Sequence, residues 1–130
     1  MKTDLPQSFK RLQYQAPVYT FDHVDLDIAL DPARTIIKSR LEVMPGKGFQ
    51  AGAPLVLVGH ELEFVSLRIN GEAHRHFELT PETLTIHSLP NEGSEKFIVE
   101  IISVCVPEKN TTLMGLYVSN GNFFTQCEAE

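Results

Sequence analysis

Residues 23–43 read HVDLDIALDPARTIIKSRLEV, and this stretch predicts the fold of the chain. Its first half alternates between apolar and acidic residues, with Val24, Leu26, Ile28 and Leu30 on one side and Asp25 and Asp27 on the other. A period of two is typical of a β-strand that has one face in water and one face against a core. The segment 23–31 is therefore predicted to be such a strand.

The second half of the stretch, TIIKSRLEV, alternates in the same way. We expect one set to point inward (Ile37, Leu41 and Val43) and the other outward (Lys38, Arg40 and Glu42). Between the halves lies DPART, a turn sequence, because Pro32 presets φ and the Asp31 side chain can accept a hydrogen bond from the backbone ahead of it. Two alternating runs across a short turn predict a β-hairpin.

The rest of the chain repeats this pattern. Asn-Gly pairs at 70–71 and 120–121 suit two-residue hairpin turns, because both positions can adopt positive φ. LVLV at 55–58 is expected to be a buried strand, and KFIVEIISVCV is expected to be the longest strand, ended by Pro107. No segment of ten or more residues has a helical period. The chain is therefore predicted to be all-β, an antiparallel β-sandwich or a twisted, saddle-like arrangement of about seven to nine strands.

Composition narrows the possible partners. The 130 residues fit one domain, and the net charge of -6 argues against nucleic acid and against an anionic membrane surface. No apolar stretch is long enough for a membrane span, and the N-terminus has no secretory signal. Cys105 and Cys127 are far apart and lack metal-binding spacing, so reduced thiols in the cytoplasm are expected.

Two patterns are candidates for chemistry. His74 and His76 form an HxH pair that could share a metal on a strand, but no third ligand is near in the sequence, so two solvated histidines are the expected reading. No nucleophile motif, phosphate loop or HExxH sequence is present, so no catalytic residue is predicted. In NFFTQCE, a strand would place Gln126 and Glu128 on one face together with Phe124, where they could hold an ammonium group. A polar edge strand in solvent is the alternative.

The C-terminal stretch NTTLMGLYVSNGNFFTQCEAE, residues 110–130, resembles the run that leads into the active site in the aminopeptidase N family of zinc-dependent gluzincin peptidases. The matching residues are Asn110, Thr111, Leu113, Gly115, Leu116, Tyr117, Thr125, Gln126, Cys127, Glu128, Ala129 and Glu130. Weaker similarity continues upstream in YQAPVY, VDLDIALD, SRLEV and APLVLVGHELEFVSLRING, so that it covers about residues 9–130. Met114 departs from the family, which often has a charged residue there.

Residues 1–16 show no strand pattern and are expected to be an extended arm. The resemblance implies that residues 17–130 form the N-terminal β-sandwich domain of a zinc metalloaminopeptidase, cut before the catalytic domain. It implies that Glu128 grips the free α-amino group of a peptide substrate and that Gln126 lines the pocket for the first side chain. The zinc ligands would lie outside this chain, in the catalytic domain on which this domain packs. The 130-residue chain by itself is then expected to hydrolyse nothing and to bind no zinc.

A second interpretation comes from a different class. The chain could be a free-standing β-sandwich that binds a partner protein through an open sheet edge and has no catalytic role. The two interpretations differ in whether the coding sequence continues into an HExxH motif.

Overall fold

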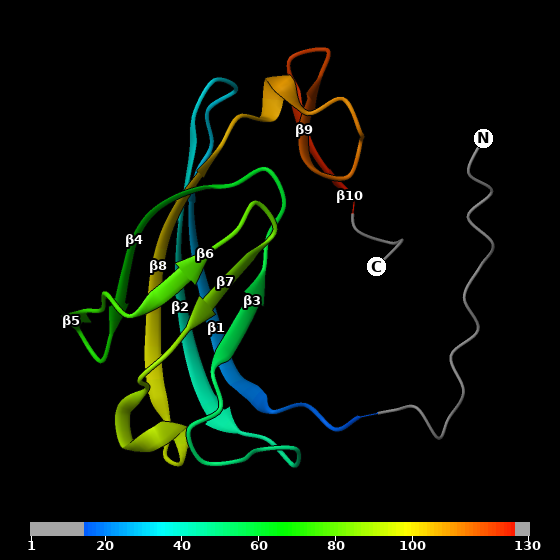
Figure 1. Cartoon of the computed structure of the whole chain (residues 1–130). Coiled ribbons are helices and arrows are strands. Elements are labelled where there is room, and N and C mark those ends of the chain that lie inside the picture. Colours follow the sequence, from blue (N-terminus) through cyan, green and yellow to red (C-terminus); the bar gives the residue numbers. More distant parts are fainter. Residues whose placement is uncertain (1–14, 127–130) are drawn as a thin grey trace.

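The computed structural model describes residues 15–126, which form three antiparallel sheets (Figure 1). The largest sheet has five strands in the order β1-β2-β8-β4-β5. Their bounds are Tyr19–Ala29 for β1, Thr35–Pro45 for β2, Phe97–Cys105 for β8, Glu63–Ile69 for β4 and Glu72–Ala73 for β5. The only helical elements among the described residues are two 3-10 turns, η2 at Pro90–Gly93 and η3 at Pro107–Lys109. The predicted all-β class is confirmed.

The predicted hairpin at 23–43 is the β1–β2 pair. Its register places Val24 opposite Leu41 and Asp25 opposite Arg40, so apolar and charged residues separate onto the two faces of the sheet. The intervening turn forms as expected, because the Oδ1 atom of Asp31 accepts hydrogen bonds from the backbone N–H groups of Ala33 at 2.8 Å and Arg34 at 3.1 Å.

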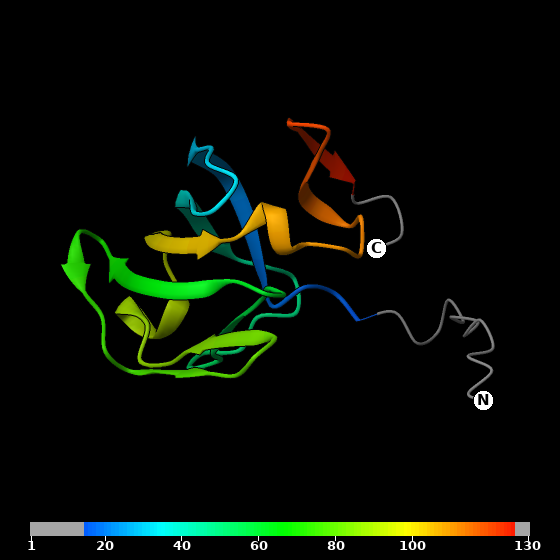
Figure 2. The ribbon, with the colours of Figure 1, turned by 90° about the horizontal axis from the view of Figure 1, so that it is seen from above.

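A three-stranded sheet covers one face of the large sheet (Figure 2). It consists of β3 at Leu55–Val58, β7 at Thr83–Ile86 and β6 at Phe77–Leu79, in the order β3-β7-β6. The core lies between the two sheets and is formed by Val43, Leu67, Ile69, Phe97 and Val99 from the large sheet and by Leu55, Leu84 and Ile86 from the small one. Packing of two apolar sheet faces is what makes each alternating strand stable in water.

Tyr19, the first residue of β1, anchors the start of this strand to the core. Its ring makes edge contacts with Phe49 and Phe97 at centroid distances of 5.7 and 5.8 Å. Its hydroxyl donates a hydrogen bond to the carbonyl oxygen of Ala53 at 2.5 Å. Burial raises the pKa of the Tyr19 phenol above its ordinary value, because the phenolate would lose hydration there. This aromatic cluster closes the end of the core near the loop at 46–54.

Two expectations about burial are wrong. The strand at 55–58 is buried only on one side, since Leu55 is 3% exposed while Val56 is 52% and Val58 is 71% exposed. On β1, the apolar face predicted to point inward is half-exposed along its length, with Leu26 at 58%. The alternating pattern sorts side chains by face correctly, but it does not say whether another part of the described chain covers that face.

Candidate functional site

The candidate site begins on a separate hairpin at one end of the large sheet (Figure 1). Strand β9, Gly115–Ser119, pairs with β10, Asn122–Gln126, across the predicted Asn120-Gly121 turn. The φ angles of that turn, 51° at Asn120 and 78° at Gly121, are both in the left-handed region that an Asn-Gly pair tolerates. The hairpin prediction is confirmed.

Gln126 is the last described residue of β10 and is exposed to solvent. It lies opposite Gly115 in the ladder between β9 and β10. Phe124, two residues earlier on the same face, is 45% exposed, and its ring stacks on Tyr117 with a centroid distance of 5.6 Å. The structure therefore brings Gln126 next to an aromatic face at the open end of the hairpin.

Two other predicted positions fall outside the part of the chain that the structure describes. Glu128, the proposed amine ligand, and Cys127 both belong to the last four residues. The face shared by Gln126 and Glu128 and the roles of both residues stay predictions. The arm predicted at 1–16 likewise lies almost entirely outside the described range.

The hairpin is attached to the large sheet through η3. The backbone N–H of Glu108 donates to the carbonyl oxygen of Pro32 at 3.0 Å, which ties η3 to the β1–β2 turn. Pro107 is fully buried at this junction. The same turn is stiffened from inside by Thr35, which is 0% exposed and whose hydroxyl donates to the carbonyl oxygen of Asp31 at 2.8 Å. The base of the hairpin therefore has a fixed support.

A second feature of functional interest is the apolar face of β1. Val24, Leu26 and Ile28 are 48%, 58% and 46% exposed, and β1 is the edge strand of the five-stranded sheet. The small sheet packs on the core residues of β2, β8 and β4 and leaves this part uncovered (Figures 1 and 2). A row of exposed aliphatic side chains on an open sheet edge is typical of a surface that another polypeptide covers.

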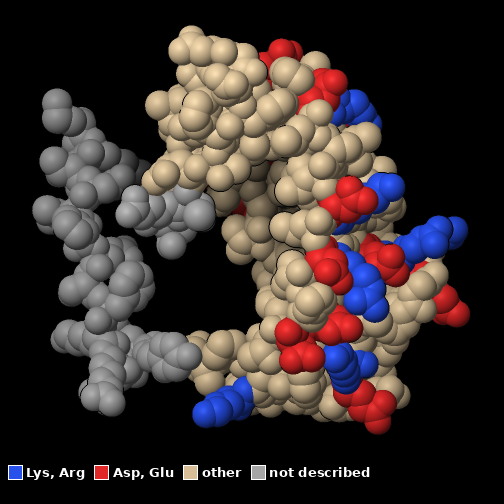
Figure 3. Space-filling model, turned by 180° about the vertical axis from the view of Figure 1, so that it is seen from behind, with Lys and Arg blue, Asp and Glu red and all other residues tan. Residues whose placement is uncertain are grey.

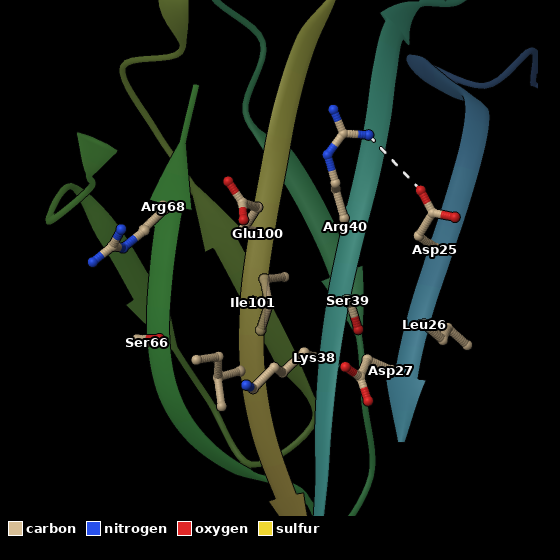
Figure 4. A pocket seen from close by; sticks show the side chains of 11 residues that line it. Asp25, Leu26, Asp27, Lys38, Ser39, Arg40, Ser66, Arg68, Glu100 and Ile101 are labelled. Atoms are coloured by element: carbon tan, nitrogen blue, oxygen red, sulfur yellow. Dashed lines mark ion pairs between the residues drawn. The ribbon is translucent and has the colours of Figure 1, made fainter. Parts of the chain in front are cut away.

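The opposite face of the large sheet carries charges of both signs (Figure 3). A shallow hollow of about 440 Å³ lies there, lined by side chains from β1, β2, β4 and β8 (Figure 4). Its charges match across neighbouring strands, since Asp25 faces Arg40, Asp27 faces Lys38, and Glu100 lies between Arg40 and Arg68. Cross-strand pairs of opposite charge stabilise a sheet. The register thus accounts for these residues without a ligand.

The HxH pair has a structural role. His74 and His76 lie between β5 and β6 and not on a strand, which corrects the expected placement. The Nε2 atom of His74 is 2.7 Å from the carbonyl oxygen of His87, and the Nδ1 atom of His76 hydrogen-bonds the Ser88 hydroxyl. Within residues 15–126, no group of three or more His, Cys, Asp or Glu side chains is placed to hold a metal ion. The two hydrogen bonds fasten the 74–76 segment to residues 87 and 88.

Cys105 is a free thiol at the end of β8. It is half-buried, and this burial raises the pKa of the thiol above its ordinary value, because the thiolate is poorly solvated there. A raised pKa leaves less of the thiol as the reactive thiolate at neutral pH. No helix among the described residues is long and apolar enough to cross a lipid bilayer.

The known proteins that are similar to this chain in sequence are bacterial aminopeptidases. No family model matches the chain. Its sequence is 34% identical over 120 residues to aminopeptidase N of Haemophilus influenzae and 36% identical over 128 residues to aminopeptidase N of Escherichia coli. These matches cover 92% and 98% of this chain but only 14% of each relative. Aminopeptidase N of Caulobacter vibrioides is 36% identical over 132 residues, which cover 100% of this chain and 15% of the relative.

Solved structures with a similar fold are also peptidases. The crystal structure of Legionella pneumophila aminopeptidase A in complex with aspartic acid matches with a TM-score of 0.78 and 31% identity, over 94% of this chain and 14% of that one. An M1 zinc metallopeptidase of Deinococcus radiodurans, bound to a Tyr-Ser-Ala substrate, matches with a TM-score of 0.66 at 18% identity, covering 85% of this chain and 26% of that one. The second likeness shows a shared fold.

These matches show the class of protein to which the chain is similar, which is that of the bacterial aminopeptidases. More narrowly, the chain is homologous to a segment of aminopeptidase N and spans about 14% of the length of the curated relatives that it matches. The resemblance inferred from the C-terminal motif is therefore confirmed.

Proposed function

We propose that this chain is the N-terminal β domain of a zinc-dependent aminopeptidase, a hydrolase that removes N-terminal amino acids from peptides. The observation that carries the proposal is the identity of 34–36% to aminopeptidase N over at least 92% of the chain. In the complete protein the zinc ligands are proposed to lie outside this chain, which is supported by the finding that no group of three or more His, Cys, Asp or Glu side chains is placed to hold a metal ion within residues 15–126. The proposed compartment is the cytoplasm.

The role proposed for the end of β10 is recognition of the free amino terminus of the substrate. Glu128 pairs with the α-ammonium group, and Gln126 lines the space for the first side chain beside the exposed Phe124 ring. A peptide that continues past this position presents a neutral amide and leaves the carboxylate without its partner. Loss of one member of a buried charge pair costs about 2–5 kcal/mol, so this carboxylate can restrict cleavage to chain ends.

The role proposed for the apolar face of β1 is packing against the catalytic domain of the same polypeptide. Three aliphatic side chains there are about half-exposed, namely Val24, Leu26 and Ile28. Burial of such side chains contributes about 25 cal/mol per Å² of apolar surface removed from water. The relatives are about seven times longer than this chain, so a neighbouring domain is available to cover the face.

The test is a charge-only substitution in the complete protein. Glu128→Gln keeps the size of the side chain and removes its negative charge, and we expect kcat/KM for an aminoacyl arylamide to fall by about 30-fold to several thousand-fold. The zinc content should stay at the wild-type value. Glu108→Gln is the matched control, since Glu108 is an exposed acid on η3, and its activity should be unchanged. Near wild-type turnover by Glu128→Gln would refute the role assigned to Glu128.

A second candidate function is a protein-interaction module without a catalytic partner in the same chain. The observation in its favour is the long edge strand β1, which pairs only with β2 among the described residues. The two candidate functions predict different effects of the substitution Leu26→Asp in the complete protein. An interdomain role predicts a lower unfolding temperature and faster proteolysis between domains, whereas an external binding surface predicts neither change.

A further inference from the structure

The side chain of Asn110 makes four hydrogen bonds close to the candidate site. Its Nδ2 atom donates to the carbonyl oxygens of Met114 at 2.6 Å and Leu116 at 2.9 Å. Its Oδ1 atom accepts from the backbone N–H of Thr112 at 3.1 Å and from the Thr112 hydroxyl at 2.8 Å. A primary amide has two N–H donors and two acceptor lone pairs, so Asn110 uses its full capacity within one loop.

That loop contains a backbone conformation at Leu113 that is unfavourable unless neighbouring contacts stabilise it. Leu113 has a φ of 60°, in the left-handed region, and its side chain is 56% exposed. A non-glycine residue there is strained by about 1–3 kcal/mol and persists only where the surroundings enforce it. The two carbonyl groups that Asn110 holds belong to Met114 and Leu116, one and three residues after Leu113. Asn110 is therefore well placed to enforce the turn at Leu113.

The held carbonyls lie at the start of β9, directly across from the end of β10. Leu116 pairs with Thr125, and Gly115, between the two held carbonyl groups, pairs with Gln126. On its other side Asn110 continues from η3, which is bonded to Pro32 in the rigid β1–β2 turn. Asn110 thus connects η3, which is bonded to the β1–β2 turn, to the β9–β10 hairpin that carries the site.

We propose that Asn110 is a positioning residue that sets the direction of the last residues of β10 and so places Gln126 against the substrate. This inference rests on the proposed function, because it assumes that the end of β10 contacts the peptide amino terminus. Asn110 touches no substrate in this account. It acts through the carbonyl groups of β9 and through the ladder between β9 and β10.

The test uses Asn110→Asp in the complete protein. Aspartate has the shape of asparagine and keeps both acceptor contacts with Thr112, but it turns an oxygen toward the carbonyls of Met114 and Leu116, so two donated bonds are lost. We expect KM for an aminoacyl arylamide to rise by about tenfold, the effect of about 1.4 kcal/mol, while kcat changes less than about twofold. Zinc content should be unchanged.

Two further measurements separate positioning from general damage. Asn91→Asp is the matched control, because Asn91 also donates from Nδ2, to Glu95 at 2.9 Å, but lies at η2, in a different part of the fold. It should leave KM unchanged. Backbone amides of β9 and β10 should exchange hydrogen for deuterium faster in Asn110→Asp, while those of β8 keep wild-type protection. If Asn110→Asp does not fold, Thr112→Ala removes one of the four bonds, together with the long bond that the Thr112 hydroxyl accepts from the backbone N–H of Met114 at 3.4 Å, and should raise KM by about twofold to threefold.

The outcomes are distinct. An unchanged KM in Asn110→Asp, together with impaired Glu128→Gln, overturns the positioning role and leaves the proposed function intact. A fall in kcat alone, with KM unchanged, indicates a smaller active fraction and likewise overturns it. Wild-type kinetics in Glu128→Gln refute the substrate-anchoring role proposed for the end of β10, and the inference about Asn110 falls with it.

Discussion

Thr35 offers the sharpest test of how the site is supported. It is fully buried, its hydroxyl donates to the carbonyl oxygen of Asp31 at 2.8 Å, and the same hydroxyl accepts from the backbone N–H of Asp31 at 3.1 Å. Thr35→Val keeps the branched shape and removes both bonds. Since each bond contributes about 0.5–1.5 kcal/mol net, the free energy of unfolding should fall by about 1–3 kcal/mol.

The assay is urea and thermal unfolding of this chain, followed by circular dichroism. For a domain of this size 1 kcal/mol corresponds to about 3–5 °C, so a loss of about 2 kcal/mol lowers Tm by about 6–10 °C. Thr83→Val is the control, because the Thr83 hydroxyl is paired with the hydroxyl of Thr80 at an exposed turn. The control should change stability by less than about 0.5 kcal/mol. If Thr35→Val is as stable as the control, the β1–β2 turn is not held by this hydroxyl.

Three further predictions concern the core, the thiol and the open face. Gly93→Ala should be strongly destabilising, because φ is 80° and a Cβ atom would lie 2.2 Å from the Tyr19 hydroxyl oxygen; adding Tyr19→Phe should restore part of the loss in a double-mutant cycle of Tm values. Cys105 should react with iodoacetamide more slowly than the unfolded chain at pH 8, as seen by peptide mass mapping. Because its pKa is raised in the folded state, the contribution of this thiol to stability should decline only as the pH rises through the ordinary value of 9.0 and above. Phe97→Ala should cost about 3–5 kcal/mol by urea unfolding, whereas Leu26→Ser on the exposed face should change stability by less than about 0.5 kcal/mol; equal losses would mean that β1 is covered within this chain.

Local features of the fold follow from the sequence. Alternation between apolar and charged residues predicted β1 and β2, a run of β-branched residues predicted β8, and the Asn-Gly pairs predicted both hairpin turns, because these signals depend on neighbouring residues. The expectation that β8 is the longest strand is wrong, since it has nine residues and β1 and β2 have eleven each. The order β2-β8-β4 depends on contacts between distant segments and has no counterpart in a period of two. The exposure of Leu26 could not be predicted for the same reason. An alternating pattern shows which side chains share a face, but it does not show which distant segment covers that face.

The candidate site shows a similar division. The position of Gln126 near the end of a strand was predicted from alternation and a turn. The role of Asn110 was missed, although Asn followed two residues later by Thr is a pattern in which an asparagine side chain accepts from the backbone ahead of it. Its two bonds to the carbonyls of Met114 and Leu116 could not be predicted, because they require the left-handed turn at Leu113.

The placement of β8 in the middle of the large sheet has a consequence for biosynthesis. β1 and β2 are complete at residue 45, yet the strand that must lie beside β2 begins at Phe97. A ribosome that adds about 5–20 residues per second needs several seconds to make the stretch between them. During that interval β1 and β2 are paired with each other, and the outer backbone edge of each strand is unpaired. Chaperones that shield nascent strands should therefore matter most for this protein between the emergence of β2 and that of β8.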